Sequence, residues 1–278
     1  MIENIKKRIS CRTFRNEAIE PGKLDELKAV LAGCTEAPFG SRVWFELCDF
    51  EKMSGEDIRA CGTYGVIKGA RHFIAGAVVK AERAMEDYGY CLEKIILHAT
   101  GMGLGTCWLG GTFRRTGFAA IIRLSEDELL PAITPVGYAA SRRSLVEHAF
   151  RFGAGSNRRK PWHELFFTED LKPLEKDAGP YAPVLACVRI GPSASNKQPW
   201  RIIRDGDKDR FHLFVQRTPG YGDYGEIRLQ NVDMGIAMCH FEQSAQALGL
   251  DGQWEVADPK IAARAMEYIV SWKGSGKS

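Results

Sequence analysis

The order of apolar and polar positions along this chain predicts helices mixed with short strands. Leucine, alanine and valine recur at helical spacing over residues 21–31, behind a proline that suits a first turn. A longer and mostly apolar helix is expected over residues 87–101. Strands are predicted at residues 43–50, 73–79 and 133–138, and the small and branched side chains of 73–79 indicate a buried strand.

A second copy of the long helix follows later in the chain. Six residues recur in register, and the members of each pair stand 146 positions apart, as 233 does from 87. We therefore predict an internal duplication with a first half at residues 1–165, a linker at 166–174 and a second half at 175–278. The aspartates that open the two helices are interpreted as N-caps or first-turn acids. The six pairs are Asp87/Asp233, Gly89/Gly235, Ala99/Ala245, Gly103/Gly249, Leu104/Leu250 and Trp108/Trp254.

The composition is that of a folded soluble protein, with 45% hydrophobic and 26% charged residues. The 38 basic and 35 acidic residues leave a net charge of only +3, which argues against nucleic acid or an anionic membrane as a main partner. No apolar signal-peptide core opens the chain, and its most apolar stretch, at 95–111, is broken by His98 and by glycines. We expect a cytoplasmic protein without a membrane span.

Cysteine and histidine are spread too widely to suggest a metal or redox pair. No two of the eight cysteines are closer than thirteen positions, so no C-x-x-C motif exists. The six histidines stand singly, without a glutamate or cysteine at metal-ligand spacing. We therefore expect buried, reduced thiols and no metal.

The stretch 191–200, Gly-Pro-Ser-Ala-Ser-Asn-Lys-Gln-Pro-Trp, joins an apolar helical run at 182–190 to a strand predicted to begin near Arg201. Its first proline ends the helix, and its second keeps the exit extended. The serines, asparagine and glutamine offer several hydrogen-bond donors and acceptors beside an aromatic residue. These groups suit a flat polar ligand, although the same residue types also suit an ordinary turn.

This string resembles the P-S-x-x-N-x-Q-P-W signature of the nitroreductase-like flavoproteins, which in that family lies against FMN. The resemblance implies an α+β, nitroreductase-like fold with two pseudo-symmetric halves, each with a small mixed or antiparallel sheet and a long central helix. It also implies that Gln198 and Trp200 fix the loop, with Trp200 in the core. Four loop residues would lie against the isoalloxazine and ribityl groups: Pro192, Ser193, Ala194 and Asn196.

In most of the family this signature stands near the N-terminus, whereas here it lies two thirds of the way along. The family's members are homodimers in which each flavin lies between two subunits. A fused duplication would keep one good copy of each part of the site in different halves, and residues 38–44 are a degraded echo of 192–200. We therefore expect one FMN site between the two halves, and a monomer that acts as a pseudo-dimer.

Near the N-terminus, Arg8, Ser10 and Arg12 resemble the family's R-R-S-x-R-x-F segment, which grips FMN. Arginine forks and a serine hydroxyl match the charge and the acceptor oxygens of a phosphate. Ile9 stands where the family often has a second arginine, which raises the question of how tightly the phosphate is held. By itself, the segment also fits a solvated basic helix.

A second basic run precedes Pro161 and resembles the family's basic stretch ahead of its closing helix. We predict that Arg158 and Arg159 provide a second grip on the phosphate. A charge run of this kind is also typical of a solvated face or linker. Arg142 and Arg143, after the predicted strand at 133–138, are competing candidates for the same role.

The glycine-rich segment 103–112 follows a helix and leads toward a strand, which is the reverse of the order in a dinucleotide-binding fold. It resembles instead the family's G-L-G-x-x-x-x-G loop, in which a backbone N–H points at flavin N5. Gly110 and Gly111 would allow close approach of the backbone to the ring. A tight turn is the alternative interpretation.

The aromatic stretch 218–225 would cap the flavin face where substrates dock, or would be a surface loop. The resemblance implies an FMN-dependent oxidoreductase that passes hydride from NADH or NADPH through flavin N5 to a small nitroaromatic or quinone-like oxidant. No Ser-His-Asp set, paired carboxylates or P-loop suggests another chemistry. Two alternatives remain: a flavin-binding sensor or carrier without turnover, and a structural relic without flavin.

Overall fold

The computed structural model describes residues 1–34, 37–141, 158–176, 179–206, 209–261 and 265–275. Helices and short strands are mixed over this part of the chain, as the sequence predicts. The described residues of the first half form helices α1 (Ile2–Lys7), α2 (Pro21–Gly33), α3 (Gly55–Ala60), α4 (Ala84–Gly101) and α5 (Arg115–Ile121), and strands β1 (Val43–Asp49), β2 (His72–Val79), β3 (Gly105–Thr106), β4 (Glu128–Leu129) and β5 (Thr134–Gly137).

The second half repeats this mixture with a long helix of its own. Its described helices are α7 (Ala182–Arg189), α8 (Leu229–Ala247) and the short 3₁₀ turns Gly179–Tyr181 and Ala194–Asn196, and a further 3₁₀ turn, Trp162–Glu164, lies at the end of the first half. Its strands are β6 (Phe166–Thr168), β7 (Trp200–Arg204), β8 (Arg210–Val215), β9 (Asp223–Tyr224), β10 (Ile227–Arg228), β11 (Gly252–Glu255) and β12 (Glu267–Gly274).

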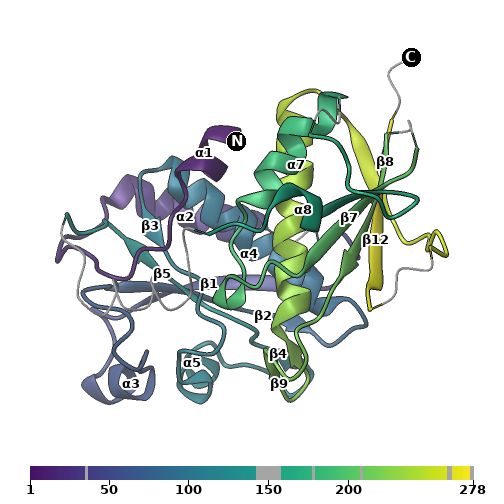
Figure 1. Cartoon of the computed structure of the whole chain (residues 1–278). Coiled ribbons are helices and arrows are strands. Elements are labelled where there is room, and N and C mark those ends of the chain that lie inside the picture. The colour runs from purple at the N-terminus through teal and green to yellow at the C-terminus, as the bar shows by residue number, and fades with distance from the viewer. Residues whose placement is uncertain (35–36, 142–157, 177–178, 207–208, 262–264, 276–278) are drawn as a thin grey trace.

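Each half has its own sheet. In the first, β2 is antiparallel to β1, β4 and β5, and β3 pairs with the far side of β5. The second has the order β11-β12-β8-β7-β6 and is antiparallel except for the pair β6 and β7. Strand β2 is buried over nearly its whole length, which explains its unbroken apolar sequence. In Figure 1, the first sheet occupies the lower part of the molecule, and the second lies to the right of α8.

The segment 166–174, expected as a linker, takes part in the second sheet. Strand β6 pairs in parallel with β7, placing Phe166 opposite Ile202. Phe166 is fully buried, so its apolar side chain gives this segment a reason to join the sheet. A single hydrophobic cluster also contains residues from both halves, from Ile5 to Trp272. The two halves therefore share one core.

Helices α4 and α8 pack against each other at the centre of the molecule (Figure 1). A Cβ atom at Gly89 would stand 2.1 Å from the carbonyl oxygen of Val232, and one at Gly235 would stand 2.0 Å from that of Glu86. Only a residue without a side chain lets the two backbones approach this closely. The glycines that recur in the two long helices thus have a structural role at their crossing.

The cysteines follow the expectation from their spacing. All eight lie in the described residues, are buried, and form no disulfide. Within the same residues, no helix combines the length and apolar character needed to cross a membrane. Nor do three His, Cys, Asp or Glu side chains gather there in a group that could hold a metal ion.

Candidate functional site

A cavity of about 590 Å³ lies between the two halves. This volume is within the range of ordinary small-molecule sites. Its wall combines the segment after α1, the glycine segment after β3, the loop after α7, the β9–β10 hairpin and the first turns of α8. Ten of the eleven residues that the sequence nominated line it: Arg8, Ser10, Arg12, Gly110, Gly111, Arg159, Pro192, Ser193, Ala194 and Asn196.

The second basic run is only partly in the wall. Arg159 lines the cavity, whereas the exposed side chain of Arg158 does not. Arg158 contributes its carbonyl oxygen, which accepts a hydrogen bond of 2.7 Å from the Asn196 amide. The competing candidates Arg142 and Arg143 lie outside the described residues. Of these two neighbouring arginines, only Arg159 thus faces the cavity.

Among the cationic groups of the wall, Arg8 gives the strongest indication of a bound anion. It ends α1, and the chain then runs alongside β3, where Cys11 N–H donates to the carbonyl of Thr106 at 2.8 Å. Arg8 is only 9% exposed, and its Nε and Nη1 atoms have no hydrogen-bond partner among the described residues. An unsatisfied buried guanidinium is costly, so this geometry favours an acceptor-rich ligand in the cavity.

Glu93 stands behind this part of the wall. Its Oε1 is 3.8 Å from Arg8 Nε, which is too long for a hydrogen bond. The same oxygen lies 2.8 Å from His240 Nε2, and Oε2 accepts a 2.6 Å bond from Trp108 Nε1. Both the carboxylate and the imidazole are fully buried, so α4 and α8 are joined directly beneath the cavity. The negative charge helps to keep Arg8 in place and leaves its donors for a ligand.

The cationic side chains of the wall lie close enough to repel one another. Burial and then the positive charges of Arg8 and Arg189 lower the pKa of Arg159. An anion bound among these groups would relieve that repulsion. Arg159 is held in position by bonds from Nη1 to Asn196 Oδ1 at 3.0 Å and from Nη2 to the Ile190 carbonyl at 3.2 Å. This end of the cavity is therefore suited to a phosphate or another compact anion.

The loop after α7 has an unusual backbone. Ser195, Asn196 and Gln198 have φ angles of 43°, 55° and 48°, in the left-handed region that non-glycine residues rarely occupy. Gln198 holds this shape: its N–H donates to Ser193 Oγ at 2.8 Å, and its side-chain oxygen accepts from Lys160 N–H at 2.8 Å. Gln198 is buried and Trp200 is fully buried. The bonds of Gln198 agree with its predicted role in fixing the loop, and Trp200 lies in the core as predicted.

Such strained conformations are concentrated at functional sites. Here the strain gathers in the stretch that carries the signature residues. Asn196 uses its side chain to hold Arg158 and Arg159, as described above, in addition to lining the cavity. The asparagine thus links the loop to the basic run near the end of the first half.

The two glycines of the first half face side chains of the second half. A Cβ atom at Gly111 would stand 2.3 Å from Tyr224 Oη, and one at Gly110 would stand 2.8 Å from Leu229 Cδ1. Leu229 and Tyr224 also line the cavity. A side chain at either position would therefore require the Leu229 or Tyr224 side chain to move away from the cavity wall.

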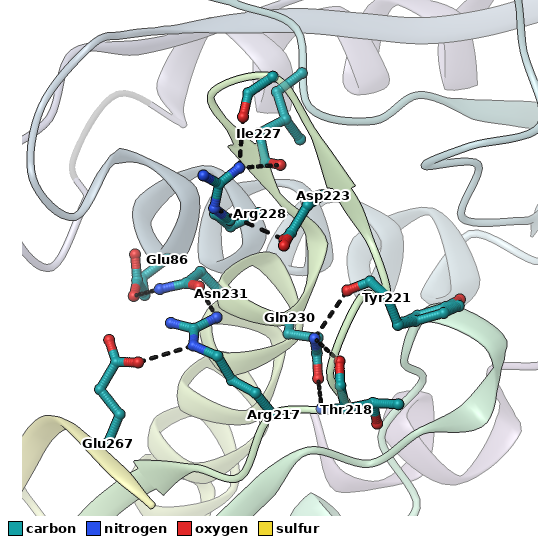
Figure 2. Close-up of polar contacts among 11 residues, drawn as sticks. Glu86, Arg217, Thr218, Tyr221, Asp223, Ile227, Arg228, Gln230, Asn231 and Glu267 are labelled. Carbon is teal, nitrogen blue, oxygen red and sulfur yellow. Dashed lines mark hydrogen bonds and ion pairs between the residues drawn. The ribbon is translucent and has the colours of Figure 1, made fainter.

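The stretch 218–225 lies over the cavity and includes β9. Figure 2 shows Gln230, near the start of α8, reaching into this stretch. Its Oε1 accepts from Thr218 N–H at 2.7 Å, while Nε2 donates to the carbonyls of Thr218 and Tyr221 at 3.2 and 2.9 Å. Tyr221 then donates its hydroxyl to Ser195 Oγ at 2.6 Å. The stretch is thus a fastened cap, bonded to the signature loop.

The start of α8 is itself tied to α4 and to the second sheet (Figure 2). Asn231 donates to Glu86 Oε1 at 2.6 Å and accepts from Arg217 Nη1 at 2.8 Å. Arg217 also donates through Nε to Glu267 at 2.8 Å. Burial raises the pKa of Glu86 to about 7. These contacts fix the first turn of α8, where Gln230 holds the cap.

Asp233 is a wall residue that the sequence reasoning did not nominate. It is the fifth residue of α8, outside the first turn, and it caps no helix end. Its Oδ1 accepts a 2.9 Å bond from Ala194 N–H of the signature loop. Asp87 likewise accepts from Phe39 N–H and Ser41 N–H, in the degraded echo of that loop. In the sequence, the 146-residue offset relates these two aspartates to each other, and the structure shows that each accepts from the loop of its own half.

Removing the anchor of the cap should loosen it. We expect Gln230→Ala to destabilise the protein by about 1–3 kcal/mol, because it removes the side-chain partner of the Thr218 N–H and of the Tyr221 carbonyl, both in half-buried residues. Limited proteolysis should then cut within 218–225 faster than in the wild type. Gln246→Ala, at an exposed position on the same helix, is the matched control. Equal cleavage rates for Gln230→Ala and wild type would contradict the anchoring role.

The fold and the cavity define an α+β protein with a small-molecule site between two halves, shaped for a ligand with an anionic end. The family model described as "Putative TM nitroreductase" matches residues 1–245. The chain therefore belongs to this nitroreductase family of oxidoreductases, and the predicted nitroreductase-like fold is confirmed.

One solved structure agrees with this fold over nearly the whole chain. A nitroreductase structure from Thermotoga maritima MSB8 is 18% identical, with a TM-score of 0.62, and the match covers 98% of this chain and 92% of that one. An FMN-dependent nitroreductase from Clostridium difficile R20291 matches 52% of this chain and 90% of its own, at 22% identity and a TM-score of 0.43. A nitroreductase with bound FMN from Bacteroides fragilis NCTC 9343 gives the same coverage, with 19% identity and a TM-score of 0.39. Among curated proteins, no significant match was found.

Proposed function

We propose that this chain binds one FMN in the cavity between its halves and works as an NAD(P)H-dependent oxidoreductase on a small oxidant, such as a nitroaromatic or a quinone. The observation that carries the proposal is the buried Arg8, which lines a cavity of suitable size and whose Nε and Nη1 donors have no hydrogen-bond partner among the described residues. Membership of a nitroreductase family and the FMN named for two structural neighbours support the choice of cofactor.

The phosphate of FMN would lie among Arg8, Ser10, Arg12 and Arg159. Guanidinium forks and a hydroxyl match a dianionic phosphate in both charge and hydrogen-bond geometry. The mutual repulsion of Arg8 and Arg159 adds a reason for an anion to bind there. Ile9, where the family often has an arginine, is 52% exposed at the wall, so Arg159 is the residue that would replace the missing charge.

The ring of FMN would lie between the two halves. Gly110 and Gly111 provide a wall without side chains, and Pro192, Ser193 and Ala194 provide the opposite edge. When bound, the flavin supplies a ring that accepts a hydride and passes electrons on. The protein's own residues bind and orient the ring, and the cap carrying Tyr221 and Tyr224 limits the access of water and substrate.

A duplicated chain of this kind would contain one complete site and act as a monomeric pseudo-dimer. In the first-half loop, both carboxylate oxygens of Asp87 are used by backbone N–H groups of Phe39 and Ser41. Arg83 packs its guanidinium 5.2 Å from the centre of the Phe39 ring and donates to the Ile269 carbonyl. These contacts engage the first-half loop with the protein itself, which supports a single site per chain.

A second candidate function is a flavin-binding carrier or sensor without turnover. The bond of 2.6 Å between Tyr221 and Ser195 favours it, because a fastened cap would hinder the exchange of two substrates in one pocket. Both candidates bind FMN and differ only in electron transfer.

The absorption spectrum of the purified protein tests the proposal. We expect a yellow protein, or a colourless one that acquires the flavin spectrum when FMN is added and retains it through gel filtration. Anaerobic addition of NADH or NADPH should then bleach the flavin, and a quinone or nitroaromatic should restore the colour. A protein that retains no FMN would refute both functions, and a flavin that neither nucleotide bleaches would leave the carrier.

A further inference from the structure

Asp233 lines the cavity, and its hydrogen bonds differ from those of Asp87, the matching residue of the first half. Asp233 is 3% exposed, and its Oδ1 accepts the Ala194 N–H. Its Oδ2 is buried and has no hydrogen-bond partner among the described residues. Asp87 has both oxygens bonded to loop amides, from Phe39 and Ser41. Both carboxylate oxygens of Asp87 thus accept hydrogen bonds from the protein, whereas Oδ2 of Asp233 is left for a ligand.

The reason for the difference lies in the loop. In the first half, two backbone N–H groups turn toward the carboxylate. In the second half, the N–H of Asn196 turns away and donates to the Ser193 carbonyl at 2.9 Å, as part of the left-handed turn through Ser195 and Asn196. The backbone strain of the signature loop therefore removes a donor from Asp233. The strain and the open carboxyl oxygen belong to the same local structure.

A buried carboxyl group with a single donor favours its protonated form. No ion pair reaches Asp233 from any described residue, although Lys6, Arg8, Arg12 and Arg159 share the wall with it, as do Tyr221 and Tyr224. Burial raises the pKa of Asp233 to about 8, and the bond from Ala194 opposes this rise. At neutral pH the group is mostly a carboxylic acid, which has one O–H to donate.

We propose that Asp233 is a ligand-binding residue that keeps its proton at neutral pH and donates it, through Oδ2, in a hydrogen bond to an oxygen or nitrogen acceptor of the bound flavin. This inference rests on the proposed FMN site. A flavin offers such acceptors along its ribityl chain and its ring edge. A protonated donor also suits a reducible ring better than a fixed negative charge would, since negative charge develops on the ring during reduction.

The proposal predicts a specific pH dependence of binding. If the bound flavin accepts the Asp233 proton in a hydrogen bond, the pKa of Asp233 is higher in the complex than in the free protein. Affinity is then fully present below the free-protein pKa of about 8 and is lost as pH rises above it. The dissociation constant for FMN should increase by about tenfold per pH unit in that range.

Titration of FMN fluorescence against wild type, Asp233→Asn and Asp87→Asn, from about pH 6 to pH 10, tests this linkage. Asparagine copies the protonated acid, since it accepts at Oδ1 and donates from Nδ2. We expect Asp233→Asn to bind FMN at neutral pH within about threefold of wild type, and to lack the loss of affinity at high pH that is specific to the carboxyl group. Asp87→Asn, which changes the matching residue away from the cavity, should keep the wild-type pH profile.

Other outcomes distinguish an error in the role of Asp233 from an error in the FMN site itself. Parallel pH profiles for wild type and Asp233→Asn would overturn the role of Asp233 and leave the FMN site standing. Binding by Asp233→Asn that is about 100-fold weaker at neutral pH would also overturn it, by showing a carboxylate that accepts from the ligand. Failure of all three proteins to bind FMN would instead refute the proposed function. Thermal unfolding of each variant checks that it is folded.

Discussion

Arg8→Ala is expected to weaken FMN binding about 100-fold, by removing charge-assisted hydrogen bonds to the phosphate. In the wild type, Arg8 is buried beside the cavity with Nε and Nη1 available, and Glu93 at 3.8 Å keeps the guanidinium in place without using those donors. A bound phosphate would therefore accept hydrogen bonds from Arg8 Nε and Nη1 that no described residue accepts. Fluorescence titration of FMN against the variant measures the change.

Two further variants define what Arg8 does. Arg15→Ala removes the same charge from an exposed side chain that pairs with Glu17 outside the cavity, and should bind FMN as wild type does. Arg8→Lys keeps the charge but loses the fork, and should lie between wild type and Arg8→Ala. Wild-type affinity in Arg8→Ala would place the phosphate elsewhere on the protein.

Gly235→Ala is expected to destabilise the fold by about 3 kcal/mol or more, because the new methyl group would meet backbone atoms of α4 that cannot move aside easily. Its Cβ would stand 2.0 Å from the Glu86 carbonyl oxygen and 2.7 Å from Tyr90 N. The two long helices would have to separate, which would also disturb the cavity floor. Thermal unfolding without ligand should show a midpoint lower by about 6–12 °C.

Gly33→Ala provides the matched control for this prediction. Gly33 lies at the end of α2, and a Cβ atom there would have no heavy atom within 4 Å. Because alanine favours a helix more than glycine does, this change should leave the midpoint unchanged or raise it slightly. If both variants unfold at the same temperature, close backbone contact between α4 and α8 is not what the glycines provide.

Much of the cavity wall could be predicted from short motifs. The signature loop, the N-terminal Arg-x-Ser-x-Arg and the paired glycines are local patterns, and each has a local structural cause, such as the left-handed turn that requires Gln198 to hold it. The repeat between residues 87 and 233 was also visible, and it marked the glycines of the helix crossing. Within the stretch expected as a linker, Phe166 is buried and begins a strand that pairs with β7, which local sequence did not indicate.

Other parts of the site could not be predicted from any motif. Arg158 and Arg159 are chemically identical neighbours, and only their places in the folded chain put one in the wall and the other outside it. Gln230 is an ordinary helix residue in the sequence, yet its side chain holds the cap through Thr218 and Tyr221. Such roles depend on contacts between segments that are distant in the chain or face different ways.

The sequence by itself determined the alternation of helices and strands, the repeated Asp-x-Gly pattern and the residue types suited to a phosphate and a flat ring. These features follow from hydrophobic periodicity and side-chain chemistry, which depend only on residues close together in the chain. Only the tertiary structure decided which donors remain unsatisfied. Arg8 and Asp233 are left with open hydrogen-bonding groups because α4, α8 and the signature loop exclude water there without supplying every partner, and that balance exists only when distant segments pack together.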